Sequence, residues 1–312
     1  MLKRAFLFFL VVCSSMLFAA CLDKGNTDRN SGKLRVSASI VPLGDFASKI
    51  GGDAVDVTVV VPPGANPHVF EPSPGQLIDF GKSDVFVCVG AGFEFWKDKF
   101  IESSGRSDIE VVALSDGIDL IGGECSCGHE HSDGHGHSSD DHDSRGGNPH
   151  VWTSPALVAG FVPRLEKVFS EKDPANADVY KGNAAVLMAD LRRLDSECRK
   201  AVSSFKTRKF MSQHAVWSYF AREYGLEEVG AIEKSPGKEP SPAEIESLIK
   251  TAKESGVSVI FADAQFSPKA AEAVSKDGNL KIVVLDAVGS SEGTGYCDMM
   301  RENLRRMSEV MR

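Results

Sequence analysis

The 312-residue chain lacks an excess of basic residues: it carries 35 Lys and Arg against 44 Asp and Glu, for a formal net charge of −9. Proteins that bind nucleic acid or anionic lipid ordinarily present a positive surface to the phosphates. The acidic balance therefore argues against both of these partners. It suits a protein that handles cations.

Cysteine is present but has no framework spacing. Of the seven cysteines, Cys13 lies in an apolar stretch at the N-terminus and Cys21 follows that stretch. The other five, an odd number, are Cys88, Cys125, Cys127, Cys198 and Cys297. Disulfide scaffolds of exported domains carry an even number of cysteines at characteristic spacings. The chain is therefore not a disulfide-linked scaffold, and whether any of these five cysteines forms a disulfide stays open.

Long apolar runs are missing after the first twenty residues. A membrane-spanning helix needs roughly 20 apolar residues, and the run from Ala5 to Phe18 is too short for that. Two basic residues precede this run and two alanines end it, an order typical of a secretory signal. We therefore predict a signal peptide over residues 1–20 and an exported protein, in the periplasm or at the cell surface.

The residues after this signal predict a membrane tether. The segment Phe18-Ala19-Ala20-Cys21 resembles the lipobox of bacterial lipoproteins, whose cysteine carries the lipid. We expect Cys21 to be acylated, with an ordinary cysteine after a cleaved signal as the alternative. Residues 21–33 are polar and have little capacity to bury a core.

Short β-branched runs alternate with amphipathic stretches in both halves of the chain. The predicted strands are residues 34–39, 55–61, 85–89, 109–113, 209–212, 228–232, 257–261 and 280–285. The predicted helices are residues 43–50, 75–81, 93–103, 215–224, 242–255, 268–276 and 296–312. This alternation is typical of parallel sheets flanked by helices. The roughly 290 residues after the signal favour two domains, so we predict two α/β lobes, residues 34–172 and 206–312.

One long helical pattern lies between the two halves. The apolar positions recur every three or four residues and are Tyr180, Ala184, Leu187, Leu191, Leu194, Cys198, Ala201 and Phe205. Asp173 fits the N-cap and Pro174 the first helical position. A helix from 174 to 205 would be roughly 48 Å long, enough to run along both lobes. We predict a stiff linking helix over residues 173–205, which argues against a large hinge closure.

Residues 122–147 depart from this globular pattern, reading GGECSCGHEHSDGHGHSSDDHDSRGG. The candidate metal ligands in this segment are Cys125, Cys127, His129, His131, His135, His137 and His142. Histidine- and cysteine-rich tracts bind transition metals loosely, and glycines fix no ligand geometry. We predict an accessory loop with several weak zinc sites. Whether its two cysteines take part as thiolates stays open, because oxidation outside the cell would remove them.

Outside that loop the chain has only three histidines, His68, His150 and His214. A lone histidine is more often a core or surface residue than a ligand, but here the placement is informative. His68 and His214 each follow a predicted strand, and Asp286 follows the apolar run KIVVL. In open α/β sheets, ligands bind in the crevice at the carboxyl ends of the strands. Three imidazoles and a carboxylate, two from each half, could therefore meet in a cleft between the lobes.

Four of these segments resemble a known family. GANPHVFEPSP, NPHVWTSP, SQHAVWSYFAREYGL and VVLDAVG are similar to the ligand segments of the metal-binding lipoproteins of zinc and manganese ABC importers. GAGFEFWKDKF and GYCDMMRENLRRM are similar as well, and the resemblance extends from about Lys33 to Arg312. It implies two α/β lobes, each with a mainly parallel sheet, joined by one rigid helix.

The resemblance also implies a ligand set in the cleft between the lobes: His68, His150, His214 and Asp286. Members selective for manganese tend to place a carboxylate at the third position, where this sequence has His214. Val216-Trp217-Ser218 departs from the family's aromatic and glycine pattern after the third ligand. That departure bears on the surroundings of the metal, not on the ligand.

The donor set favours zinc. Neutral imidazole suits zinc, copper, nickel and iron, whereas manganese and calcium prefer more oxygen donors. Three nitrogens and one oxygen satisfy a tetrahedral zinc, and a catalytic zinc would keep one position open. The sequence has no HExxH motif. We therefore predict a monomeric protein that is not an enzyme, which captures Zn²⁺ and delivers it to the membrane permease of an ABC importer.

Three alternatives stay open. Manganese or ferrous iron could be the cargo, the protein could be an extracellular zinc-dependent hydrolase, or it could be an adhesin whose metal is structural. Since imidazoles must be neutral to bind metal, we expect zinc affinity to fall below about pH 6.5.

Overall fold

The computed structural model describes residues 32–122, 147–234, 236–290 and 293–312, and residues 34–312 form one compact unit. The predicted signal peptide, Cys21, most of the predicted tether and every cysteine and histidine of the predicted accessory loop lie outside the described residues. Among the described helices, none is long and apolar enough to cross a membrane.

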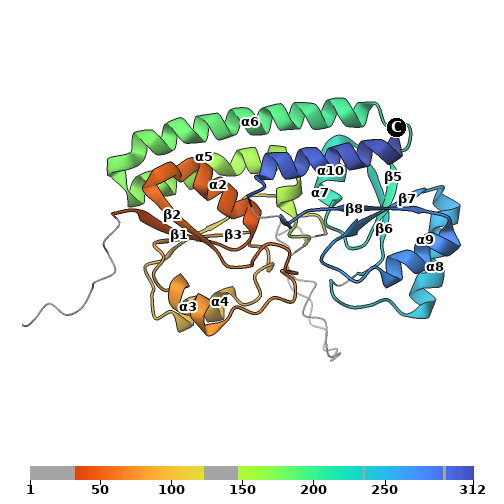
Figure 1. The fold of residues 1–312 in the computed structure, drawn as a ribbon, viewed down its shortest axis with the longest axis horizontal. Helices are drawn as coiled ribbons and strands as arrows, with labels where there is room; N and C mark the ends of the chain where they lie inside the picture. The colour runs from red at the N-terminus through yellow and green to blue at the C-terminus, as the bar shows by residue number, and fades with distance from the viewer. Residues whose placement is uncertain (1–31, 123–146, 235, 291–292) are drawn as a thin grey trace, which may run out of the picture. The chain divides into compact units, whose positions relative to one another are not determined.

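The first of two parallel sheets organises the N-terminal lobe (Figure 1). Its strands are β1 (Leu34–Ala38), β2 (Val55–Val59), β3 (Val85–Cys88) and β4 (Glu110–Ala113), in the order β2-β1-β3-β4. All three pairings are parallel, and the four residues of β3 are buried. Such an apolar central strand is expected where helices cover both faces of a parallel sheet. The covering helices are α2 (Val41–Gly51) and α5 (Pro155–Lys172) on one side, and α3 (Pro74–Phe80) and α4 (Lys97–Ser103) on the other.

The C-terminal lobe repeats this topology. Its strands are β5 (Lys209–Ser212), β6 (Glu227–Ala231), β7 (Val259–Asp263) and β8 (Lys281–Leu285), in the order β6-β5-β7-β8. Its helices are α7 (Ser218–Tyr224), α8 (Pro242–Ser255), α9 (Lys269–Gly278) and α10 (Tyr296–Met311). In each sheet the strand order reverses next to the first strand, which creates a switch point between β1 and β3 and between β5 and β7. The predicted α/β class, with a parallel sheet in each lobe, is confirmed.

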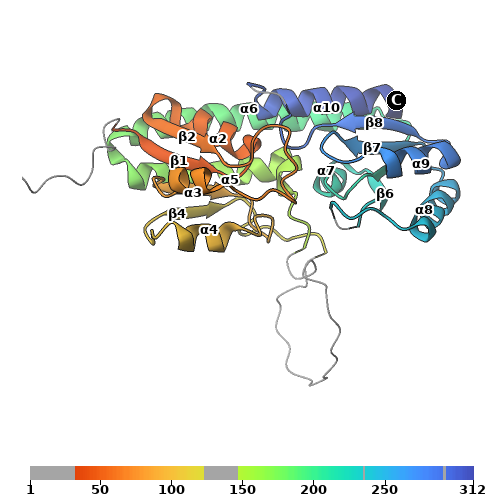
Figure 2. The same cartoon turned by 60° about the horizontal axis from the view of Figure 1, so that its bottom comes forward.

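The predicted long helix is α6 (Ala177–Ser203), which follows a 3-10 turn at Pro174–Asn176. Its 27 residues make it roughly 40 Å long, and Figure 2 shows it side by side with α10. Asp173 is the N-cap residue of this 3-10 turn and Pro174 is its first residue, but the Asp173 side chain makes no capping hydrogen bond. Its carboxylate instead accepts hydrogen bonds from Asn176 Nδ2 at 2.7 Å and from the Tyr180 hydroxyl at 2.6 Å, which brace the turn.

Helix α5 was not predicted, although its sequence carries the usual signals. The Ser154 hydroxyl accepts from the Leu157 backbone N–H, and Pro155 occupies the first helical position. The buried face is formed by Val158, Phe161, Val162, Leu165 and Phe169. Pro163 lies inside the helix, where proline costs about 3 kcal/mol in an isolated helix. Packing of α5 against α6 and the sheet outweighs this penalty.

One apolar core runs from the N-terminal lobe into the C-terminal lobe. It joins residues of β1, β3 and α5 to residues of α6, α7 and α10, and a smaller second core lies under α8 and α9. The cysteines among the described residues, Cys88, Cys198 and Cys297, are free thiols buried in the larger core. Separating the lobes would expose this shared apolar surface, which opposes wide opening.

Candidate metal centre

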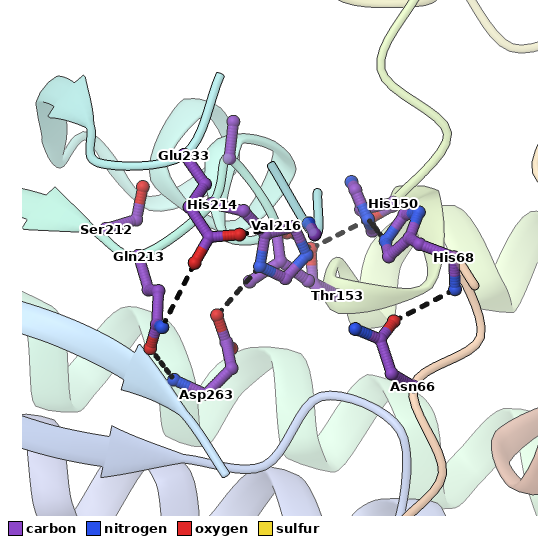
Figure 3. A network of polar contacts seen from close by, with 12 residues as sticks. Asn66, His68, His150, Thr153, Ser212, Gln213, His214, Val216, Glu233 and Asp263 are labelled. Carbon is purple, nitrogen blue, oxygen red and sulfur yellow. Dashed lines mark hydrogen bonds and ion pairs between the residues drawn. The ribbon is translucent and has the colours of Figure 1, made fainter. Parts of the chain in front are cut away.

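The three histidines outside the accessory loop lie together between the two sheets (Figure 3). His68 belongs to the loop between β2 and α3, and His150 immediately precedes a 3-10 turn at Val151–Thr153. His214 comes from the other lobe, two residues after β5. The predicted meeting of these three imidazoles at the carboxyl ends of strands is what the structure shows.

The spacing of the rings suits one shared metal ion. One nitrogen from each ring can be chosen so that all three lie within 4.8 Å of one another, and the ring centroids are 5.0–5.3 Å apart. His68 Nε2 lies 3.1 Å from His150 Nε2. Two imidazole nitrogens on a tetrahedral zinc, each at about 2.0–2.1 Å, are about 3.3–3.4 Å apart. This pair of ligand atoms therefore needs to move only a few tenths of an ångström to hold the ion.

The space between the rings is small and enclosed. A cavity of about 10 Å³ has room for a single water-sized particle. It is lined by Pro67, His68, His150, Trp152, His214, Val216, Asp263, Gln265, Phe266, Ala287 and Val288. A wider cleft of about 690 Å³ reaches from the three histidines to Gly122 and Gly147, the described residues that flank the accessory segment. An ion bound between the rings would therefore lie at the inner end of this cleft.

The protonation of His150 is set by its neighbour Asn148. The Asn148 side-chain oxygen accepts from the His150 backbone N–H at 2.9 Å and lies 2.8 Å from His150 Nδ1. Because this atom accepts from a backbone N–H, it must be the amide oxygen, so His150 Nδ1 carries the proton. His150 Nε2 then presents its lone pair to the cavity, as a metal ligand must.

The protonation of His214 is set by Asp263, which sequence analysis missed. Asp263 is the last residue of β7, and its Oδ2 lies 2.8 Å from His214 Nδ1 (Figure 3). Both side chains are buried, at 4% and 5% exposure. A carboxylate behind a histidine holds the Nδ1–H form and strengthens Nε2 as a ligand. The signal was available, because Asp263 ends the apolar run VIFA just as Asp286 ends KIVVL.

Burial keeps two of the imidazoles neutral. It lowers the pKa of His68 from 6.5 to about 3, with a further contribution from the nearby His214. Burial also lowers the pKa of His150 well below its ordinary value, and His214 and His68 add to that shift. These two rings do not have to lose protons to bind metal at neutral pH. The lowered pKa values of His68 and His150 therefore give no reason for these two rings to lose zinc affinity at about pH 6.5.

Asp286, the predicted fourth ligand, lies outside this group of donor atoms. Its Oδ1 accepts from the backbone N–H groups of Val288 and Gly289, at 3.1 and 2.8 Å. Its Oδ2 accepts from the backbone N–H and the hydroxyl of Ser290, at 2.6 and 2.7 Å. A carboxylate has about four lone-pair positions, and all of them serve this loop. The structure thus brings three of the four predicted ligands together, whereas the Asp286 carboxylate is hydrogen-bonded to residues 288–290 of the loop that follows it.

The fold and the site define a two-lobed α/β protein that holds a metal ion between its lobes. Residues 36–310 match the family described as zinc-uptake complex component A, periplasmic, and the chain belongs to this family. The family resemblance inferred from the four segments is confirmed.

Two relatives and one solved structure show how far the similarity extends. The high-affinity zinc uptake system protein ZnuA of Bacillus subtilis (strain 168) is 31% identical over 321 residues, covering 97% of this chain and 96% of that protein. The zinc-binding lipoprotein AdcA of Streptococcus pneumoniae is 28% identical over 99% of this chain, which spans only 61% of AdcA. The Zn(II)-bound ZnuA-like domain of AdcA superposes with a TM-score of 0.71 at 25% identity, covering 90% of this chain and 99% of that domain.

Proposed function

We propose that this protein captures Zn²⁺ outside the cytoplasm and delivers it to the membrane permease of an ABC importer. One observation carries the proposal: three histidine side chains from two lobes converge on a cavity that fits a single ion. The family and the zinc-binding names of its relatives agree with this cargo. Transfer to a permease also requires that this binding is reversible.

The proposed zinc ligands are His68, His150 and His214, with Asp286 as the fourth. The nitrogens support the first part, because all three lie within 4.8 Å of one another and the His68–His150 pair already has nearly the spacing that a tetrahedral ion needs. Asp286 could bind only after one of its oxygens gives up hydrogen bonds to the 288–290 loop. We therefore expect it to add less affinity than any of the histidines.

Zinc is proposed over manganese and ferrous iron because the donor atoms that the described residues bring together are three imidazole nitrogens. Elemental analysis of protein purified without added metal, followed by competition among the three ions, separates these cargoes. Zinc should displace the other two. Retention of manganese against an equal concentration of zinc would contradict the assignment.

The decisive experiment is His214→Ala with zinc titrated against a chelator of known affinity. Loss of one of three histidine ligands should weaken binding at least a hundredfold, whereas His142→Ala in the accessory segment should leave the tight site unchanged. Tight binding that survives His214→Ala would show that the third ligand is assigned to the wrong residue. The same loaded protein should not hydrolyse ester substrates. Zinc-dependent hydrolysis lost in His214→Ala would favour the hydrolase alternative.

The accessory segment is proposed to collect zinc beside the main site through Cys125, Cys127, His129, His131, His135, His137 and His142. The support is its composition and the place of Gly122 and Gly147 at the cleft that leads to the three histidines. Deleting residues 124–145 should lower the zinc stoichiometry and keep one tight site. Equal loss of the tight site would show that the segment supplies a ligand.

Membrane attachment is proposed through a lipid on Cys21, in the periplasm or at the cell surface. The support is the lipobox-like segment and a relative named as a lipoprotein. Cys21→Ala should release the protein from the membrane fraction. The protein is further proposed to act as a monomer, which sedimentation with and without zinc would check.

A further inference from the structure

The side-chain amide of Asn148 joins the two lobes beside the metal site. Its Nδ2 donates to the Ala215 carbonyl at 2.6 Å and to the Ser218 hydroxyl at 3.2 Å, both in the C-terminal lobe. Its oxygen accepts from His150 in the N-terminal lobe. A carbonyl cannot donate, so the Ala215 contact independently identifies the amide nitrogen. Both ends of this amide are therefore assigned.

A second carboxylate of the C-terminal lobe, Glu228, lies on the far side of Ser218. It belongs to β6, and each of its oxygens accepts one hydroxyl: Oε1 from Ser212 and Oε2 from Ser218. Burial raises the pKa of Glu228, and the two serine hydroxyls counteract that shift. Glu228 is not one of the proposed ligands, and its hydrogen bonds among the described residues go to these two serines.

These contacts form a directed chain of hydrogen bonds. His150 Nδ1–H donates to Asn148, the Asn148 amide donates to Ser218, and the Ser218 hydroxyl donates to Glu228. The Ser218 hydroxyl has a single proton, and its alternative acceptor, the Ala215 carbonyl, is farther away at 3.1 Å. This series of hydrogen bonds therefore ends on the Glu228 carboxylate, and in each of its three bonds the donor lies on the His150 side and the acceptor on the Glu228 side.

We propose that Asn148, Ser218 and Glu228 form a positioning relay that holds His150 in its Nδ1–H form and ties this ligand to the opposite lobe. The inference rests on the proposed function, in which His150 binds zinc. A carboxylate of the C-terminal lobe then supports each of His214 and His150. Asp263 contacts His214 directly, and Glu228 reaches His150 through the side chains of Ser218 and Asn148.

Two serines on the same carboxylate provide a matched pair of variants. Ser218→Ala removes the relay link, whereas Ser212→Ala removes the other hydroxyl from Glu228 and leaves the relay intact. Loss of a partner behind a metal-bound histidine typically weakens metal binding 10–100-fold. We expect about a tenfold higher zinc Kd for Ser218→Ala, because Asn148 still accepts from His150, and less than a twofold change for Ser212→Ala. Ser218→Thr keeps a hydroxyl and should restore the affinity.

A double-mutant cycle tests whether the residues act in series. Asn148→Ala should raise the zinc Kd more than Ser218→Ala, and adding Ser218→Ala to it should produce no further loss. Nitrogen-15 chemical shifts of the zinc-free protein report the proton position on His150, which should leave Nδ1 for part of the population in Asn148→Ala. Neither result is expected from a residue that only supports the fold.

The outcomes are distinguishable from failure of the proposed function. If the wild-type protein binds no zinc tightly, the function is wrong whatever the variants do. If the wild type binds zinc but Ser218→Ala and Ser212→Ala shift the Kd equally, or the double variant shows additive losses, the relay is overturned. Melting temperatures of all variants identify any that lose affinity by unfolding, and Ser218→Thr then carries the comparison.

Discussion

Burying neutral histidines should make the zinc-free protein sensitive to acid. The pKa of His68 falls from 6.5 to about 3 on folding, so the unfolded chain binds one more proton than the folded chain between these values. Stability contributed by this group is complete above pH 6.5 and is lost as the pH falls toward 3. The pKa of His150 is lowered for the same reason, and its contribution has the same sign.

The size of the effect follows from proton linkage. At pH 5 the solution is about 1.5 pH units below the pKa of His68 in the unfolded chain, and each such unit lowers the free energy of unfolding by about 1.36 kcal/mol. His68 alone should therefore cost the zinc-free protein about 2 kcal/mol between these two pH values. Other titrating groups also change the stability, so the wild type must be compared with a variant that lacks only this group.

The variant is His68→Gln, which fills the same space and does not titrate. Urea denaturation of both proteins without zinc, at pH 7 and at pH 5, yields four unfolding free energies. The wild type should lose about 2 kcal/mol more than His68→Gln on acidification. An equal loss in both proteins would refute the reasoning, because it would mean that His68 takes up its proton in the folded state.

Three further results are expected. Asp263→Asn keeps an acceptor for His214 Nδ1 but removes the charge. Zinc affinity, measured by chelator competition, should therefore fall 10–100-fold while the fold is kept. An unchanged Kd would show that the carboxylate does not support the ligand. Asp286→Asn should weaken zinc binding less than His214→Ala does, since Asp286 already serves its own loop; an equal loss would make it a full ligand. His214→Glu should shift competition between zinc and manganese toward manganese, since it replaces a nitrogen donor by oxygen; unchanged selectivity would place the discrimination elsewhere.

Much of the fold could be predicted from local pattern. The eight strands are short runs whose neighbours are turns or amphipathic stretches, and each was predicted within two residues of its observed ends. Strand β5 and helix α8 have the predicted bounds, Lys209–Ser212 and Pro242–Ser255. Helix α8 begins with a capping box formed by Ser241 and Glu244, which marks the start of a helix within the sequence itself.

The errors lie where tertiary contacts override local signals. Helix α5 contains Pro163, a helix breaker in isolation, and it persists because its apolar face packs on α6. Helices α4 and α7 begin later than predicted, at Lys97 and Ser218, because the residues before them form loops. The late start of α7 leaves the segment after His214 free to face the metal site.

By itself the sequence determined the α/β class, the linking helix and the three histidines, because each of these depends on residue type and spacing along the chain. It also placed two of these histidines, His68 and His214, after predicted strands, and the carboxyl ends of parallel strands share one edge of a sheet. The tertiary structure alone decided which carboxylate supports the site. Asp263 and Asp286 end similar apolar runs, but the first faces His214 across 2.8 Å and the second is held by the loop that follows it. The direction of a side chain at the end of a strand depends on what packs around it, and that is not encoded in the run of residues before it.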